Sequence, residues 1–312
     1  MVPQNVLPQN DASTGPARFN PMLEPQPSRL PRRIAVVGSG TIGPDIAYYL
    51  LSDLPGAQVL LVDIDAAALT RARERLAGYA DKGVKRGKLT AQQAAEVVRN
   101  LSTSTDYASM KDCDWVLEAA TENLALKRRI FSDIEAVVPP QAWITSNTSS
   151  LPARRLFSHL ARPGRATVTH FFAPAFQNPV VEVVGWPGVS AQVLRELRWV
   201  FASTGKVPMI TADQVCFMLD RIFDNWCNES GLLLDRASAA QVDSVAQEFV
   251  HAGPFFVLNL SNGNPIIIET NALQAEEEGA HYQPAPVFTS VDRWKTTPPG
   301  KSVEVPAETR AA

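Results

Sequence analysis

One histidine and one glutamate in this sequence stand where a proton transfer would be chemically useful. His170 lies in the apolar segment 167–172, and Glu182 follows twelve residues later among the valines of 180–184. A carboxylate on so apolar a strand is costly to bury without a partner, and an imidazole on the neighbouring strand would be that partner. Such a pair fixes the tautomer of the histidine and raises its basicity, which suits a general base. The pattern leaves a second interpretation open, in which Glu182 faces solvent on an edge strand and His170 is a core residue.

A glycine-rich segment indicates where a phosphate group would bind. It follows the apolar run 34–37, precedes a helical pattern, and reads Gly38-Ser39-Gly40-Thr41-Ile42-Gly43. The three glycines predict, in order, a tight turn, close approach of the backbone to a pyrophosphate, and close packing of helix on strand. Asp63 ends a second apolar run twenty residues after Gly43. A carboxylate there accepts hydrogen bonds from the adenosine ribose and repels a 2′-phosphate. All seven residues are therefore predicted to bind a dinucleotide, NAD in preference to NADP.

The elements that must position these residues alternate along the chain. Strand-like apolar runs are separated by helical patterns and lie at 34–37, 59–62, 115–117, 142–145, 167–172 and 180–184. This alternation predicts an α/β fold, a Rossmann-type, mostly parallel sheet domain. After Ile210 the pattern becomes helical, with helices expected at 214–234 and 241–249, so a smaller all-helical domain should follow the sheet.

The predicted divisions of the chain follow from this pattern and from composition. Residues 1–31 hold seven prolines and almost no apolar periodicity, which predicts a disordered leader. The NAD-binding domain is expected at 32–211 and a helical substrate or dimerisation domain at 212–270. Residues 271–312 are acidic and rich in proline, and we expect an irregular tail there.

Composition excludes several classes of protein. The 312 residues carry a net charge of −3, which argues against binding along the phosphates of a nucleic acid. No run of eighteen apolar residues is present, so no membrane partner is expected. The three cysteines have no Cys-x-x-Cys spacing and no metal-ligand cluster accompanies them, so we expect neither disulfides nor a metal. A reducing, cytoplasmic location is the simplest prediction.

Taken together, the motifs resemble those of the L-3-hydroxyacyl-CoA dehydrogenase family, over about residues 33–264. The segments that carry the resemblance, besides the glycine-rich one, are Glu122-Asn123-Leu124 with Lys127, Ser146-Asn147-Thr148-Ser149-Ser150, and His170-Phe171-Phe172 with Glu182. Several motifs in the right order are far more specific than one alone. The resemblance implies NAD-dependent, reversible oxidation of (S)-3-hydroxyacyl-CoA to 3-oxoacyl-CoA, a reaction of fatty-acid β-oxidation, with an acyl-CoA partner and a possible homodimer.

The resemblance also implies roles for single residues. His170 matches the base that takes the hydroxyl proton, Glu182 the carboxylate that orients it, and Ser149 a serine near the substrate oxygen and the nicotinamide. Glu122, Lys127 and Asn147 match residues that line the cofactor. The basic stretch that includes Lys82 and Lys85 lies where the family contacts CoA, although a charge run is more often a solvated face.

Two positions depart from the family's pattern. Ala173 and Asp220 stand where asparagines are usual, and an ionised aspartate accepts hydrogen bonds but donates none. Asn178 is a possible substitute for the missing amide, and a protonated Asp220, or one that accepts from an unusual substrate group, is another solution. Two alternatives to the main interpretation remain. One is an NAD-dependent dehydrogenase of a free hydroxy acid or sugar acid, and the other is an NAD-binding structural or regulatory protein without turnover.

Overall fold

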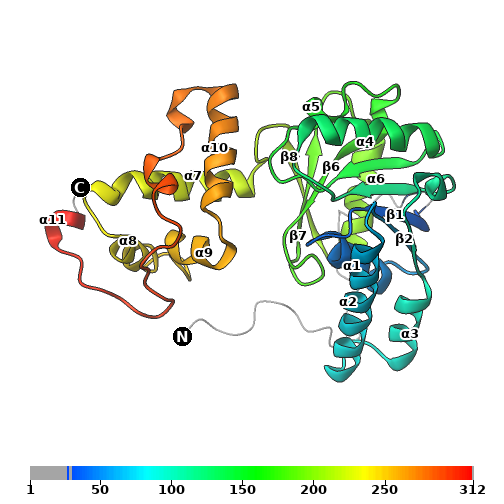
Figure 1. The fold of residues 1–312 in the computed structure, drawn as a ribbon, viewed down its shortest axis with the longest axis horizontal. Coiled ribbons are helices and arrows are strands. Elements are labelled where there is room, and N and C mark those ends of the chain that lie inside the picture. The colour runs from blue at the N-terminus through cyan, green and yellow to red at the C-terminus, as the bar shows by residue number, and fades with distance from the viewer. Residues whose placement is uncertain (1–26, 28–29, 311–312) are drawn as a thin grey trace, which may run out of the picture.

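The chain forms an α/β unit followed by a helical unit, with one helix, α7 (Leu219–Leu232), running from the first into the second (Figure 1). The computed structural model describes residue 27 and residues 30–310. The predicted leader at 1–31 lies almost entirely outside the described residues. Among those residues, none of the helices has the length and apolar character needed to cross a bilayer.

The α/β unit is built on one mixed sheet whose spatial order is β3-β2-β1-β4-β5-β6-β7-β8. The strands are β1 (Arg33–Val37), β2 (Gln58–Val62), β3 (Leu101–Ser104), β4 (Trp115–Glu118), β5 (Trp143–Ser146), β6 (Ala166–Phe171), β7 (Val180–Gly185) and β8 (Val207–Ala212). All neighbours are parallel except β6 and β7, which are antiparallel. The predicted fold class is confirmed. The order reverses between β1 and β4, and in such sheets ligands bind beyond the carboxyl ends of the strands at that point.

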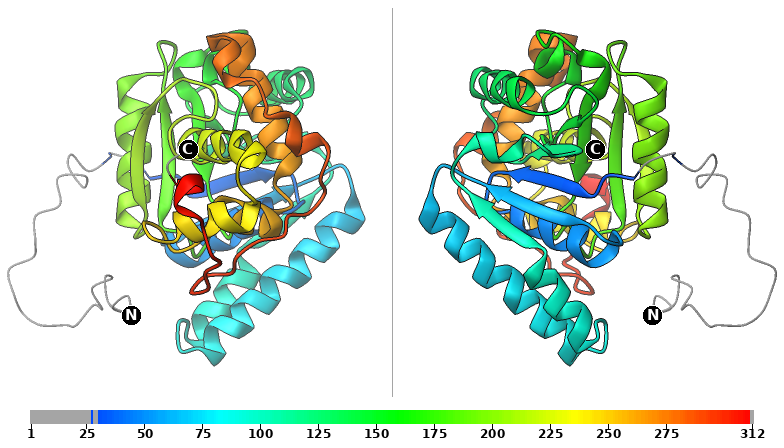
Figure 2. Two further views of the ribbon diagram at one scale, coloured as in Figure 1. Left: turned by 90° about the vertical axis from the view of Figure 1, so that its left-hand side faces the viewer. Right: turned by 90° about the vertical axis from the view of Figure 1, so that its right-hand side faces the viewer.

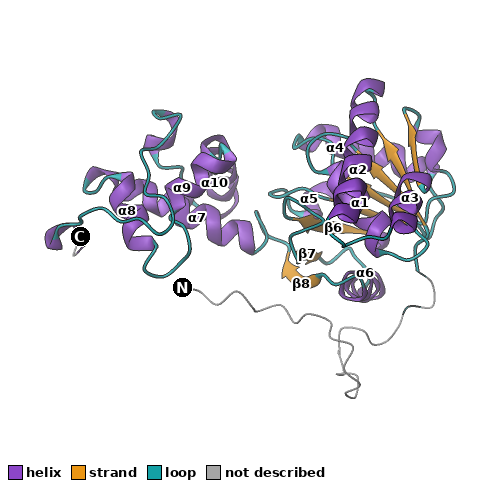
Figure 3. Ribbon diagram, turned by 90° about the horizontal axis from the view of Figure 1, so that it is seen from below, coloured by secondary structure: helices purple, strands orange, loops and turns teal. Residues whose placement is uncertain are grey.

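Both faces of the sheet are buried, which explains why the central strands are continuous apolar runs. In β1, Ile34 and Val36 face one hydrophobic cluster, whereas Ala35 and Val37 face the other. Helices α1 (Gly43–Asp53), α2 (Ala66–Lys85), α3 (Ala91–Arg99) and α6 (Ala191–Ser203) cover the first face. Helices α4 (Leu124–Val137) and α5 (Ala153–Phe157) cover the second (Figure 3).

Local capping defines where the helices of the first face begin. The side chain of Asp65 accepts a hydrogen bond from the backbone of Ala67 at the start of α2, and Thr90 and Gln93 form a reciprocal capping box at the start of α3. Helices α2 and α3 project together from the body of the unit as a hairpin (Figure 2).

The sequence analysis does not predict two of the strands, β3 and β8. β3 has the sequence LSTS and is mostly polar, and β8 contains Pro208. Each lies at an edge of the sheet, where a strand needs no apolar face on both sides and tolerates a proline. Apolar periodicity therefore carries little signal for either.

The helical unit begins later than the sequence predicts. The helix expected at 214–234 starts at Leu219, because Cys216 and Phe217 have φ angles of 60° and 51°, which break a right-handed helix. Helices α8 (Ala239–Ala246), α9 (Pro254–Ser261), α10 (Asn264–Glu278) and the short α11 (Ala307–Arg310) complete the unit.

The prediction of an irregular tail from residue 271 is wrong at its start, since α10 continues through this position to Glu278. The buried face of α10 is largely polar and includes Asn271 and Gln274, so it lacks the apolar stripe that reveals a helix in sequence. Beyond it, Phe288 and Trp294 pack into the hydrophobic core of the helical unit.

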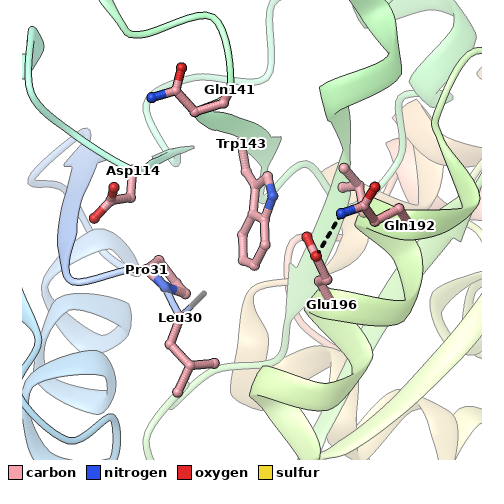
Figure 4. A pocket seen from close by; sticks show the side chains of 8 residues that line it. Leu30, Pro31, Asp114, Gln141, Trp143, Gln192 and Glu196 are labelled. Atoms are coloured by element: carbon pink, nitrogen blue, oxygen red, sulfur yellow. Dashed lines mark hydrogen bonds between the residues drawn. The ribbon is translucent and has the colours of Figure 1, made fainter. Parts of the chain in front are cut away.

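A hollow of about 300 Å³ lies at the amino-terminal edge of the sheet, opposite the edge where the carboxyl ends of the parallel strands lie (Figure 4). Asp114 accepts the backbone N–H groups of Arg32 and Arg33 there, and Gln192 donates to Glu196 at 2.9 Å. Of the residues that the structure describes, no histidine, cysteine or lysine lines this hollow. His170, near the carboxyl end of β6, lies instead at the other edge of the sheet.

Candidate active site

The structure pairs His170 with Glu182. The two residues are directly opposite in the antiparallel register of β6 and β7, and Nδ1 of the imidazole lies 2.9 Å from Oε2 of the carboxylate. Glu182 is fully buried and His170 is 4% exposed. The alternative interpretation, in which Glu182 faces solvent from an edge strand, is therefore wrong, because β8 covers that side of β7.

The second oxygen of Glu182 is also bound. Oε1 accepts the backbone N–H groups of Met218 at 3.1 Å and Leu219 at 2.9 Å, at the start of α7. These N–H groups only donate, so Glu182 acts as an acceptor on both oxygens and the proton of the neutral imidazole belongs on Nδ1. Nε2 of His170 then presents a lone pair to the cleft, as a general base requires.

The glycine-rich turn has the shape of a phosphate cradle. A Cβ on Gly38, whose φ is 107°, would lie 2.5 Å from the carbonyl oxygen of Ala119, and one on Gly43 would lie 1.9 Å from that of Gly38. Only glycine fits either position. Nothing lies within 4 Å of the Cβ position of Gly40, so this backbone is open to a ligand at the start of α1. These residues fit the pyrophosphate of a dinucleotide.

Asp63 lies at the edge of a hollow of about 790 Å³ beside this turn. One carboxylate oxygen accepts from the backbone N–H and the hydroxyl of Ser39, both at 2.7 Å, and the other accepts from the N–H of Asp65 at 2.9 Å. Partial burial opposes ionisation, but the hydrogen bonds from Asp65 and Ser39 outweigh it and lower the pKa of Asp63. The ionised carboxylate fits a ribose diol and opposes a 2′-phosphate.

Replacing Asp63 by asparagine tests this discrimination. The variant loses the charge that repels a 2′-phosphate and weakens the acceptor for the ribose, so NAD should bind roughly ten- to a hundredfold more weakly relative to NADP. Calorimetric titration of both dinucleotides gives the ratio directly. Asp133→Asn is the matched control, since Asp133 is an exposed carboxylate of the same hollow and its loss should leave the preference unchanged. An unchanged ratio in Asp63→Asn would contradict the assignment.

A cleft of about 530 Å³ brings most of the predicted site residues together between the two units. Its lining includes Gly40, Thr41, Ile42, Glu122, Lys127, Asn147, Ser149, His170, Ala173 and Asp220. The side-chain oxygen of Asn147 accepts the backbone N–H of Phe171 at 2.9 Å, which leaves its NH₂ group for a ligand. Asn178 does not line the cleft, and its side chain accepts from the N–H of Val180 at 3.4 Å.

Glu118, which the sequence analysis misses, lies behind the wall of the cleft and binds Lys127, which lines it. Its carboxylate, at the end of β4, accepts Nζ of Lys127 at 2.9 and 2.8 Å, and the hydroxyl of Ser146 at 2.6 Å. Glu118 is fully buried and Lys127 is 1% exposed. The sequence pattern that could have identified Glu118 is the same one that identifies Glu182, namely a carboxylate at the end of, or within, a buried apolar strand.

Glu122 links the same cluster to the loop after β5. It lies 3.4 Å from Nζ of Lys127, accepts the hydroxyls of Thr148 and Ser150, and accepts the N–H of Ser149 at 3.3 Å. Glu122 and Lys127 are thus held in place at the wall of the cleft, with Ser149 beside them.

The basic residues before Thr90 divide into two groups. Lys82, Arg86 and Lys88 line a separate hollow of about 430 Å³ between α1, α2 and the loop that contains Phe176. Lys85 lies on α2 but does not line this hollow. The structure therefore gathers three cations of the stretch at one place and leaves Lys85 on an exposed surface.

Comparisons with known proteins agree with this architecture. The chain is 36% identical over 207 residues to the 3-hydroxyadipyl-CoA dehydrogenase of Escherichia coli (strain K12), an alignment that covers 66% of this chain and 43% of the relative. The crystal structure of (S)-3-hydroxybutyryl-CoA dehydrogenase from Ralstonia eutropha superposes with a TM-score of 0.78 at 28% identity, over 84% of this chain and 93% of that one.

The 3-hydroxybutyryl-CoA dehydrogenase of Escherichia coli K12 also superposes with a TM-score of 0.78, at 31% identity, over 84% of this chain and 56% of that one. The chain thus spans about half or less of the length of the Escherichia coli relatives. The family model described as "3-hydroxyacyl-CoA dehydrogenase, NAD binding domain" matches residues 33–214, which include the glycine-rich turn and the His170–Glu182 pair. The predicted cofactor, NAD, is confirmed by this match, and the chain belongs to the 3-hydroxyacyl-CoA dehydrogenase family.

Proposed function

We propose that this chain catalyses the reversible, NAD-dependent oxidation of (S)-3-hydroxyacyl-CoA to 3-oxoacyl-CoA. The observation that carries the proposal is the buried His170–Glu182 pair, whose free imidazole nitrogen opens into a cleft that also contains the glycine-rich turn. The relatives named above act, by their names, on 3-hydroxyacyl-CoA thioesters. The geometry of the pair suits the proton transfer of that reaction.

In this mechanism His170 takes the proton of the substrate's 3-hydroxyl on Nε2. Glu182 supports the step because its carboxylate stabilises the imidazolium that forms and keeps the ring oriented. When bound, NAD⁺ supplies the acceptor for the hydride that leaves C3. The NH₂ group of Asn147 and the hydroxyl of Ser149 line the same cleft and would orient the nicotinamide and the substrate oxygen.

The CoA part of the substrate needs a surface for its phosphates. We assign this role to the hollow lined by Lys82, Arg86 and Lys88, which lies on the same side of the α/β unit as α1. The three cations outnumber the one carboxylate of the same hollow, Asp53, so they attract a phosphate group, and the attraction weakens as salt screens it. Lys85 lies outside this hollow, so its part in the proposal is long-range attraction only.

A direct assay separates this proposal from its alternatives. Purified protein should oxidise NADH with acetoacetyl-CoA, and free CoA should inhibit. Turnover of free hydroxy acids or sugar acids without inhibition by CoA would instead favour the first alternative. Calorimetric binding of NAD with no turnover across a panel of 3-hydroxyacyl-CoA and 3-oxoacyl-CoA substrates would favour a protein that keeps the cofactor and lacks the reaction.

A further inference from the structure

A second carboxyl group faces the catalytic imidazole from the other side of the cleft. Asp220 lies in the first turn of α7, and its Oδ2 is 3.6 Å from Nε2 of His170. The side chain of Asp220 is 29% exposed and lines the cleft, whereas that of His170 is 5% exposed. A separation of 3.6 Å is too long for a hydrogen bond. A substrate oxygen that hydrogen-bonds to Nε2 of His170 would therefore also lie close to the carboxyl group of Asp220.

The hydrogen bonds around His170 limit how many protons can be shared between its Nε2 atom and the carboxyl group of Asp220. Glu182 occupies Nδ1 of His170 and accepts on both of its oxygens, so the neutral imidazole offers only a lone pair at Nε2. An ionised Asp220 would offer only lone pairs as well. Two facing acceptors repel, so one proton stabilises the pair, placed either on Asp220 or on Nε2.

The groups around Asp220 favour keeping that proton on the carboxyl. Glu182 on β7 and Asp224 on α7 are acidic neighbours, and Glu269 on α10 lines the same cleft. Burial raises the pKa of Asp220, the nearby charge of Glu182 raises it further, and His170 lowers it. Burial also raises the pKa of Asp224 to about 7.

The positive charges at the cleft have other partners. Lys127 is bound by Glu118 and lies near Glu122, and Arg221, next to Asp220 in sequence, pairs with Glu278. Among the described residues that line the cleft, His170 is thus the group that could offer Asp220 a positive charge, and it does so only when its imidazole is protonated. The carboxyl is stabilised in its neutral form whenever the imidazole is neutral.

We propose that Asp220 acts as a neutral carboxylic acid that donates a hydrogen bond to the C3 oxygen of the substrate, while His170 exchanges a proton with the same oxygen. During oxidation the O–H bond breaks and its proton moves to Nε2, the C3–H pair leaves as hydride to NAD⁺, and the C3–O double bond forms. Asp220 keeps its proton throughout and stabilises negative charge on the oxygen. This inference rests on the proposed function.

The active form then needs two protonation states at once, a neutral imidazole and a protonated Asp220. The rate of oxidation should rise with pH as the pair of His170 and Asp220 loses its first proton, and fall again as the pair loses its second. The two limbs belong to the pair of groups rather than to either alone. A site that held an ordinary amide in place of Asp220 would show only the rising limb.

The test is the pH dependence of kcat/KM for the oxidation of (S)-3-hydroxybutyryl-CoA with saturating NAD⁺. Wild-type protein should give a bell-shaped profile. Asp220→Asn, a neutral donor of the same shape, should lie within a few-fold of wild type at the optimum and stay level at high pH. The ratio of wild type to Asp220→Asn should fall by roughly a hundredfold across the falling limb, the cost of one lost donor to an oxyanion.

Asp220→Leu separates donation from charge. This variant has no ionisable group and no donor, so its rate should be roughly a hundred- to a thousandfold low at every pH, without a falling limb. Glu269→Gln, at an exposed position of the same cleft, is the matched control and should keep the bell. Asp224→Asn should also keep a bell-shaped pH profile, although the pH at the midpoint of its falling limb shifts.

Several results would overturn the inference while the proposed function stands. One is turnover by wild-type protein with a level rate at high pH, and another is a falling limb that persists in Asp220→Asn. A third is the disappearance of the falling limb in Asp224→Asn, which would assign it to Asp224. The last is an Asp220→Leu variant that is as active as Asp220→Asn. Absence of turnover with every 3-hydroxyacyl-CoA would overturn the proposed function and this inference together.

Discussion

Replacing His170 by alanine should lower kcat for (S)-3-hydroxyacyl-CoA oxidation by about 10²- to 10⁴-fold, because no other group can take the hydroxyl proton at this point of the cleft. Asp220, the other side chain near Nε2, is already protonated in the active form that we propose. Formation of NADH measures the rate. Loss of the imidazole also leaves Glu182 buried with its two backbone donors only, so thermal unfolding should be recorded for the same sample.

Two controls make this result specific. NAD binding by His170→Ala, measured by calorimetry, should remain close to that of wild type, because the residues of the glycine-rich turn and Asp63 are unchanged. His159→Ala removes another histidine, one that bonds to the carbonyl of Arg128 and the hydroxyl of Ser132 away from the cleft, and should keep wild-type turnover. A His170→Ala protein that is folded and retains wild-type kcat would refute the assigned base.

Replacing Lys127 by methionine should destabilise the protein by about 3–5 kcal/mol, since it leaves the carboxylate of Glu118 buried without its counter-ion. The methionine fills a similar volume, so the loss reflects charge rather than a cavity. The free energy of unfolding, from urea denaturation followed by circular dichroism, measures it. The remaining donors to Glu118, the hydroxyl of Ser146 and the N–H of Ala120, cannot neutralise its charge.

The double variant Glu118→Gln with Lys127→Met isolates this effect. Removing both charges should restore most of the lost stability, because a neutral amide can still accept from Ser146. If Lys127→Met costs less than about 1 kcal/mol, or if the double variant is no more stable than the single one, the pair does not anchor β4 to α4 in the way that its burial indicates.

How much of this site the sequence can predict depends on the separation of the interacting groups. The glycine-rich turn is the most local feature, since strand, turn and helix follow one another and the steric reason for Gly43 lies at Gly38 in the same turn; the reason for Gly38 itself lies in the distant Ala119, after β4. The His170–Glu182 pair is also accessible, because a hairpin-like pair of strands brings neighbouring runs together. Asp63 follows from its place at the end of the second strand.

Local sequence patterns do not predict contacts that depend on where the helical unit lies against the sheet. The bonds from Glu182 to the backbone of Met218 and Leu219 join positions 36 and 37 residues apart, and they depend on a turn at Cys216 that no residue-type preference announces. The approach of Asp220 to His170 follows from that turn.

The length of α10 was hidden for a different reason. Its acidic end, which looks like a solvated tail in sequence, is held by ion pairs between Glu277 and both Arg154 and Arg155, and between Glu278 and Arg221. Partners so distant along the chain do not appear in a local count of apolar residues. A helix whose charged residues pair with distant elements therefore lacks the apolar periodicity by which a helix is recognised in sequence.

The double role of Glu182 has a thermodynamic consequence for the two units. One oxygen orients the base and the other holds the first turn of α7, so the affinity of the sheet for the helical unit and the basicity of His170 are linked reciprocally. Any event that loosens α7 withdraws two donors from the carboxylate and strengthens its pull on the imidazole proton. By the same linkage, a substrate hydroxyl that donates to Nε2 of His170 should draw Glu182 toward the imidazole and weaken its hold on the first turn of α7.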